Sequence, residues 1–220
     1  MEKYFITGID TDIGKTFVSL GLCLNLVQKN YKTGYFKPFQ SGAYLENGIL
    51  MAPDVCTINK YLNIPSKYSY LLEGEVSPYL ASKLNNTNVD INKVIKDIND
   101  FSLSLDKVII EGAGGLYCPM CNKMLFSDLI KILKIPVIIV TSPNLGRLNH
   151  TIMTIECAKN NNLEIKGLII NNMPQNPNIS EQHFVEELKE FSDIDILGVI
   201  PKMKNPDKDM VIKAFEGINL

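Results

Sequence analysis

Residues 4–16 combine the residue types and the spacing that bind phosphate. An apolar run is followed by a turn rich in Gly and Asp, which closes with Gly14, Lys15 and Thr16, and an apolar helical pattern starts at Phe17. In a strand–loop–helix arrangement of this kind, backbone N–H groups and the helix dipole attract anionic phosphate oxygens. We therefore expect Lys15 to contact the terminal phosphates of a nucleotide and the Thr16 hydroxyl to bind Mg2+.

The spacing of the glycines departs from the usual phosphate-loop pattern. Five residues separate Gly8 from Gly14, whereas the usual pattern has four. The alternative interpretation is a plain turn between a strand and a helix, because a Gly-Lys-Thr triplet also arises by chance. Its position directly after a strand and before a helix favours the phosphate loop.

Short apolar runs alternate with longer helical patterns along the remainder of the chain. Residues 39–53 read as a loop and residues 64–78 as irregular, with Pro65 and Pro78 as breakers. This alternation predicts an α/β fold: a doubly wound, mostly parallel sheet with helices on both faces, in a single domain of residues 1–220. We expect strands at 3–8, 34–37, 107–111, 136–140, 167–170 and 196–199. We expect helices at 16–29, from near 54, and at 79–84, 90–101, 125–134, 147–161, 180–191 and 207–217.

Composition narrows the class of protein. Of the 220 residues 45% are hydrophobic, which is enough for a full core, and the net charge is −2, so we expect neither a nucleic acid nor a membrane surface as partner. The N-terminus lacks the pattern of a signal peptide, and the apolar runs are too short to cross a bilayer. Together with five cysteines at irregular spacing, read as reduced thiols, this predicts a cytoplasmic protein.

Polar residues come at the predicted carboxyl ends of several strands, which share one edge of a parallel sheet. Glu111 is either a Mg2+ ligand beside Thr16 or a solvent-exposed strand end, and Lys37 is either an ordinary surface lysine or a group that neutralises charge in a transition state. Asp54 is equally open, as a helix N-cap or as a second Mg2+ carboxylate. Cys118 and Cys121 form a lone Cys-x-x-Cys, for which a loop with two small side chains is favoured over a zinc site.

Five segments, taken together and in order, resemble the dethiobiotin synthetase family over nearly the whole chain. The first is the loop from Gly8 to Thr16, which shares that family's longer glycine spacing. The others are Lys37-Pro38-x-x-Ser41-Gly42, Glu111-Gly112-Ala113-Gly114-Gly115-Leu116 with Pro119, Asn144-Leu145-Gly146 with Asn149-His150, and Ile169-Ile170-Asn171-Asn172.

The resemblance implies a P-loop NTPase fold and an ATP-dependent cyclo-ligase that forms C–N bonds in biotin biosynthesis. One amine of 7,8-diaminononanoate takes up CO2 as a carbamate, which then receives the γ-phosphoryl group of ATP. The second amine attacks the mixed anhydride, closes the ureido ring and expels phosphate. Such catalysis consists mostly of positioning and charge neutralisation.

The resemblance also implies a homodimer with the substrate across the interface, where the helix that begins near Arg147 faces the substrate carboxylate of the partner subunit. It implies Mg2+ ligation by Thr16, Asp54 and Glu111, and catalytic roles for Lys15, Lys37 and Thr11. Substrate binding is implied for Thr11, Lys37, Ser41, Leu145, Gly146 and Asn149. Nucleotide binding is implied for Asp12, Ile13, Gly14, Lys15, Thr16, Phe17, Glu111, Gly112, Ala113, Gly114, Asn171 and Asn172, with Asn171 reading the base.

The sequence departs from the family at Ile9, where Thr is usual, and in the short stretch after Pro201, which bears on nucleotide preference. The main alternative is a ParA/MinD-like switch ATPase. Such loops usually carry an additional Lys, whereas this loop has Asp10 and Asp12. An amidotransferase-like domain of cobalamin synthesis usually comes with a glutaminase domain, and a non-enzymatic binding module would not need converging lysines and carboxylates.

Overall fold

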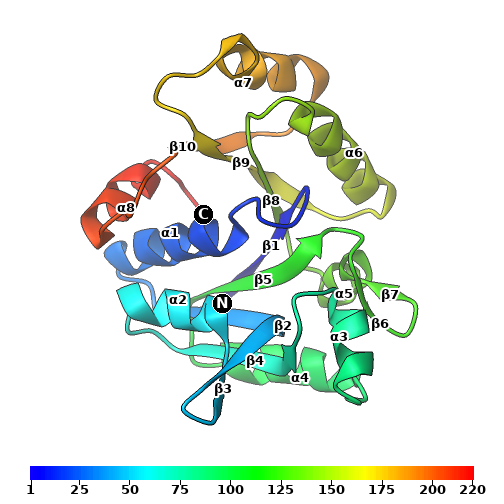
Figure 1. The fold of residues 1–220 in the computed structure, drawn as a ribbon. Coiled ribbons are helices and arrows are strands. Elements are labelled where there is room, and N and C mark those ends of the chain that lie inside the picture. Colours follow the sequence, from blue (N-terminus) through cyan, green and yellow to red (C-terminus); the bar gives the residue numbers. More distant parts are fainter.

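A twisted eight-stranded sheet forms the centre of the molecule, with helices on both faces (Figure 1). The computed structural model describes residues 1–220. The strands of this sheet are β1 (Glu2–Gly8), β2 (Thr33–Glu46), β3 (Ile49–Met51), β4 (Ser66–Glu73), β5 (Lys107–Gly115), β8 (Val137–Thr141), β9 (Ile165–Met173) and β10 (Ile196–Pro201). A separate hairpin consists of β6 (Pro119–Cys121) and β7 (Met124–Leu125).

The strand order is β10-β9-β8-β1-β5-β2-β3, and β4 also pairs with β2. All of these pairings are parallel except that of β2 with β3. From β1 the chain crosses to β2 on one side, and from β5 it later returns to β8 on the other. The carboxyl end of β1 therefore lies where the winding reverses, the usual place for a ligand in such a sheet. The predicted fold class is confirmed.

Helices cover the two faces of the sheet as two separate cores. One face carries α1 (Lys15–Gln28), α2 (Pro53–Tyr61) and α8 (Lys208–Phe215). The other carries α4 (Ile91–Ser102), α5 (Phe126–Leu133), α6 (Arg147–Asn160) and α7 (Ile179–Phe191), while α3 (Pro78–Leu84) lies next to β6. No helix is long and apolar enough to cross a membrane.

The side chains of the central strands alternate between these cores. In β1, Phe5 belongs to one core, while Tyr4 and Ile6 belong to the other. Successive strand residues point to opposite faces, so every position of a strand covered on both faces is buried and favours an apolar residue. This explains the continuous apolar runs in the sequence.

Two predicted irregular segments are strands instead. Residues 39–53, expected as a loop, contain the end of β2 and the whole of β3, joined by a tight turn in which Asn47 and Gly48 have φ of 51° and 79°. Asn-Gly is a strong hairpin signal, because both central residues of such a turn take positive φ. Residues 64–78 contain β4, whose pairing with β2 runs from Ser66 to Glu73.

Three residues that were expected at the end or the start of an element lie elsewhere in it. Lys37 and Glu111 lie within β2 and β5 and not at their last residues. The regular pairing of β1 with β5 nevertheless ends at Glu111, where the register shifts. The helix near Asp54 begins at Pro53 with Ala52 as N-cap, so the N-cap interpretation of Asp54 is wrong.

Candidate active site

The loop between β1 and α1 has the geometry of an anion-binding turn. Gly14 is the N-cap of α1 and has φ of 91°, in the left-handed region that favours glycine. The Lys15 side chain folds back over the loop, and its Nζ donates to the carbonyl oxygen of Asp10 at 3.0 Å. Burial, with a smaller contribution from the nearby Lys37 charge, lowers the pKa of Lys15. The first helical turn thus presents backbone N–H groups and a buried ammonium to the same space.

Two carboxylates from distant parts of the chain meet at the Thr16 hydroxyl. Its Oγ1 lies 3.0 Å from Oδ1 of Asp54 and 2.8 Å from Oε1 of Glu111. Asp54 comes from the first turn of α2, and Glu111 comes from β5. The structure therefore brings together the three residues that the sequence analysis grouped as metal ligands.

Lys37 of β2 links the same two carboxylates from the side. Its Nζ lies 2.6 Å from Oδ2 of Asp54 and 2.8 Å from Oε1 of Glu111, and it donates to the carbonyl oxygen of Gly112 at 3.0 Å. Burial acts to lower the pKa of Lys37, but Glu111 and Asp54 outweigh burial and raise it. Burial acts in turn to raise the pKa of Asp54, but Lys37 and the hydrogen bonds from Thr16 and Gln40 together outweigh burial and lower it. The lysine is therefore a buried cation and not a surface residue.

An open polar cavity of about 760 Å³ lies above this cluster. The predicted site residues that line it are Thr11, Asp12, Gly14, Lys15, Thr16, Lys37, Ser41, Asp54, Glu111, Ala113 and Gly114. Gln40, Gly42, Pro53, Cys118 and the segment Glu75–Pro78 complete the lining. Most of the predicted residues thus share one space although they come from four separate stretches of sequence.

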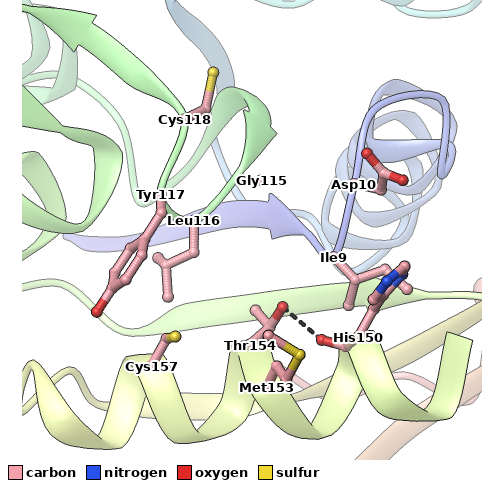
Figure 2. Close-up of a pocket in the computed structure, with 10 residues that line it drawn as sticks. All are labelled: Ile9, Asp10, Gly115, Leu116, Tyr117, Cys118, His150, Met153, Thr154 and Cys157. Atoms are coloured by element: carbon pink, nitrogen blue, oxygen red, sulfur yellow. Dashed lines mark hydrogen bonds between the residues drawn. The ribbon is translucent and has the colours of Figure 1, made fainter.

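A second, more apolar cavity of about 390 Å³ adjoins the first, and Cys118 lines both. Figure 2 shows α6 as its floor, with Met153 and Cys157 below the loop that follows β5 and with His150 near Ile9. An ion pair at one end ties α6 to the phosphate loop, because Arg147 Nη1 lies 2.8 Å from Oδ2 of Asp10.

The donor set at Thr16 fits a magnesium ion. Mg2+ is usually held by one or two carboxylates, with waters and substrate phosphates filling the other positions. Asp54 and Glu111 each turn one oxygen toward the Thr16 hydroxyl, in a wall of the cavity that also contains Lys15. A nucleotide phosphate on the loop would complete such a shell.

Comparison with known proteins shows the family. The family described as an AAA domain matches residues 2–209. The ATP-dependent dethiobiotin synthetase BioD of Anoxybacillus flavithermus is 34% identical over 215 residues, covering 96% of this chain and 97% of that protein. The corresponding protein of Clostridium acetobutylicum is 37% identical over 220 residues, covering 96% and 90%. The chain belongs to the ATP-dependent dethiobiotin synthetase family. The family predicted from the sequence is confirmed.

Solved structures of lower identity show the same fold. The MinC:MinD cell division complex of Aquifex aeolicus has a TM-score of 0.60 at 17% identity, covering 97% of this chain and 86% of that chain. A plasmid partition protein of Borrelia burgdorferi, solved with AMPPNP, has a TM-score of 0.62 at 15% identity, covering 98% and 96%. These matches extend the P-loop NTPase fold to this chain, while the dethiobiotin synthetase relatives distinguish it from the ParA/MinD-like alternative.

Several residues implied by the dethiobiotin synthetase resemblance lie outside both cavities. Phe17 packs near Phe215, and Asn172 is exposed. Ile13 and Gly112 instead contribute carbonyl oxygens, to Asn171 Nδ2 at 3.0 Å and to Lys37. Leu145 is 87% exposed, and neither Gly146 nor Asn149 lines either of these two cavities. Their role as a contribution to a partner subunit therefore stays a prediction.

The sequence analysis missed two buried residues of β2 that contact the carboxylates. The Tyr35 hydroxyl donates to Glu111 Oε2 at 2.8 Å, and the Gln40 amide bonds both the side chain and the backbone of Asp54. One signal was available: Tyr35 precedes Lys37 by two residues, so both side chains share one face of a strand. Nothing in the local sequence pointed to Gln40, because its partner is brought in by the hairpin.

Proposed function

We propose that the protein catalyses the ATP- and Mg2+-dependent carboxylation of 7,8-diaminononanoate with CO2 and its closure to dethiobiotin, giving ADP and phosphate. As a member of the ATP-dependent dethiobiotin synthetase family, it is a ligase of biotin biosynthesis. The observation that carries the detailed proposal is the convergence of Lys15, Lys37 and the cluster of Thr16, Asp54 and Glu111 on one cavity.

In the first step the diamine and CO2 form a carbamate, with loss of one proton from the nitrogen. Thr11 and Ser41 line the same cavity as Lys37, and in this proposal their hydroxyls hydrogen-bond the diamine or the carbamate. The carbamate oxygen then attacks the γ-phosphorus, and ADP leaves. The second amine attacks the carbamoyl carbon, phosphate leaves and the nitrogen loses a proton. Atoms and charges balance without a covalent enzyme intermediate.

The chain's own residues supply charge and position. In this proposal the loop N–H groups and Lys15 hold the phosphates, and Thr16, Asp54 and Glu111 would hold Mg2+. The bound ion would neutralise charge on the phosphate oxygens. The Lys37 ammonium, already buried beside the cavity, would stabilise negative charge on the carbamoyl phosphate and on the leaving phosphate.

Asn171 supports adenine as the base. It is buried, its Nδ2 donates to the Ile13 carbonyl oxygen, and its Oδ1 has no partner in the protein. Leaving a buried acceptor unpaired costs about 1–3 kcal/mol. The exocyclic amine of adenine is a donor that could satisfy it, whereas guanine has a carbonyl oxygen at the same ring position. ATP is therefore the proposed nucleotide.

The proposal includes a cytoplasmic homodimer in which Leu145, Gly146 and Asn149 of one subunit approach the substrate of the other. The three residues precede or begin α6, whose N-terminal N–H groups suit a carboxylate. Their exposure on a single chain is what such an arrangement requires.

The test is phosphate release with ATP, Mg2+ and bicarbonate, measured with and without 7,8-diaminononanoate. We expect phosphate release to depend on the diamine and to match dethiobiotin formation by mass spectrometry. Equal phosphate release without the diamine would instead indicate a switch ATPase and contradict the proposal.

A further inference from the structure

The two carboxylates beside Thr16 are each held by a second side chain from β2. The Tyr35 hydroxyl donates to Oε2 of Glu111 at 2.8 Å, and both residues are buried, at 0% and 1% exposure. Gln40, also buried, donates from Nε2 to Oδ2 of Asp54 at 3.2 Å. Its Oε1 accepts from the backbone N–H of Asp54 at 3.1 Å.

These contacts give the two oxygens of each carboxylate different partners. Tyr35 occupies Oε2 of Glu111, which leaves Oε1 turned toward Thr16 and Lys37. Gln40 and Lys37 occupy Oδ2 of Asp54, which leaves Oδ1 turned toward Thr16. One oxygen of each carboxylate therefore faces the Thr16 hydroxyl, and the other is anchored to β2.

The sheet fixes where the anchors stand. β2 pairs with β5 in parallel register, Tyr35 with Ile109 and Phe36 with Ile110, so Glu111 follows directly along the partner strand. The Tyr35 ring is enclosed in the core between the sheet and α1 and α2. A phenylalanine would fill the same space, so the hydroxyl matters through its bond to Glu111.

Gln40 joins the metal side of the site to the substrate side. Besides its two bonds to Asp54, its Nε2 donates to the carbonyl oxygen of Ser41 at 3.0 Å. The start of α2 and the backbone beside Ser41 are thus held by one buried amide. A side chain without polar atoms at this position would leave both free to shift.

We propose that Tyr35 and Gln40 are positioning residues that orient Glu111 and Asp54 for a divalent cation bound with Thr16. The inference rests on the proposed function, which supplies the cation together with a nucleotide. Residues that bond to metal ligands typically contribute about 10–100-fold to metal affinity, because they fix the rotamer and the charge of the ligand.

The experiment measures ADP binding by calorimetry, first in EDTA and then across a Mg2+ titration. Tyr35→Phe deletes one oxygen atom and keeps the ring. We expect its ADP affinity in EDTA to equal that of the parent protein, and the Mg2+ concentration for half-maximal tightening to rise about 10–100-fold. Direct Mn2+ binding, followed by electron paramagnetic resonance in the presence of ADP, should weaken by the same factor.

Tyr4→Phe is the matched control. Tyr4 is also buried, lies on β1 in the same sheet, and its hydroxyl also donates to a carboxylate, that of Glu2. The Tyr4–Glu2 pair lies at the start of β1, whereas the phosphate loop follows the end of β1. We expect Tyr4→Phe to follow the parent Mg2+ titration even where its thermal stability falls.

Gln40→Met tests the second half independently, with the same expected shift in the Mg2+ titration. A parent-like titration in either variant removes that residue from the proposal. If ADP binding by the parent ignores Mg2+, the metal assignment of the proposed function fails and this inference fails with it. If the parent depends on Mg2+ and both variants match it, only the positioning roles are overturned.

Discussion

At the scale of single residues, Lys37 is the side chain on which the charge balance of the site depends. Its ammonium is the cation shared by Asp54 and Glu111. Breaking a buried ion pair by removing one partner commonly costs about 3–5 kcal/mol, because the other charge is left without compensation. The same residue is proposed to neutralise the reacting phosphate, so its loss should show in stability and in catalysis.

We expect Lys37→Met to unfold at a lower temperature than the parent in EDTA and to recover part of the difference in Mg2+. Methionine keeps the length of the side chain and deletes the charge, so packing changes little. Nucleotide should still bind, because the loop N–H groups and Lys15 remain, while dethiobiotin formation should fall about 10²–10³-fold. The measurements are thermal unfolding, calorimetry with ADP and product formation. A collapse of nucleotide affinity with normal turnover per bound nucleotide would contradict this division of roles.

Gly14 is a second residue whose type is dictated by its surroundings. A Cβ at this position would lie 2.1 Å from Nδ2 of Asn171, and φ is 91°. We expect Gly14→Ala to displace Asn171, to lower the free energy of unfolding measured with urea and to weaken ATP binding. Gly48→Ala is the control, because φ is 79° there and no atom lies within 4 Å of the Cβ. In the control the free energy of unfolding should fall only by the cost of the left-handed conformation, about 1–2 kcal/mol.

At the scale of elements, the site depends on how the phosphate loop is attached to α6. The Asp10–Arg147 pair makes this link, and Asp10 also accepts the N–H of Thr11 through Oδ1. Arg147 and then the Thr11 N–H hold the pKa of Asp10 below its usual value. The link is partly exposed, so solvent screens it and its contribution is at most about 1 kcal/mol.

We expect Arg147→Met to lower the unfolding temperature slightly at pH 7 and low salt. Because the pKa of Asp10 is lower in the folded than in the unfolded chain, its stabilisation is complete above the ordinary value of about 4. The stabilisation is lost as the pH falls through the lowered value. The difference between parent and variant should therefore shrink in acid, and also in high salt. A difference that persists under both conditions would indicate lost packing of the Arg147 stem instead.

The parts of the fold that follow from local pattern were predictable from the sequence, and those that depend on pairing partners were not. The buried strands around β1 can be recognised in the sequence as apolar runs, and Gly14-Lys15-Thr16 marks the start of α1. β4 was missed because Ser66 to Glu73 mixes polar and apolar residues, and only its place next to β2 makes it a strand. An edge strand of this kind carries a weak local signal.

The site shows the same division. Lys15, Lys37 and Glu111 can each be recognised as candidate site residues, because they lie next to apolar runs and turns. Their mutual contacts follow from the register of β1, β2 and β5, which no single stretch of sequence specifies. Tyr35 illustrates the limit: its sequence context indicates an ordinary core tyrosine, and only the pairing of β2 with β5 brings Glu111 within hydrogen-bond distance of its hydroxyl.

At the scale of the whole molecule, the proposed nucleotide side of the site is well formed within one chain, and the proposed substrate side is open. The polar cavity is lined from within the chain, whereas Leu145 and the start of α6 face outward beside the second cavity. Exposure of residues that the family resemblance assigns to the substrate is what a site shared between two subunits requires. The proposed homodimer can therefore be tested through catalysis.

Subunit complementation provides that test. Asn149→Asp adds a negative charge near the expected substrate carboxylate, and its effect on the fold should be small because Asn149 is exposed and an acidic residue suits a helix N-terminus. Lys37→Met disables the other half of the site, so each variant alone should be nearly inactive in dethiobiotin formation.

Mixing the two variants under conditions that exchange subunits should restore activity. In a two-fold symmetric dimer half of the molecules become mixed, and each mixed dimer has one site with both defects and one with neither, so about a quarter of the parent activity should return. Light scattering during the exchange would verify that the mass is that of a dimer. If exchange is complete and activity stays at the level of the single variants, both residues act within one chain, and the shared site is wrong.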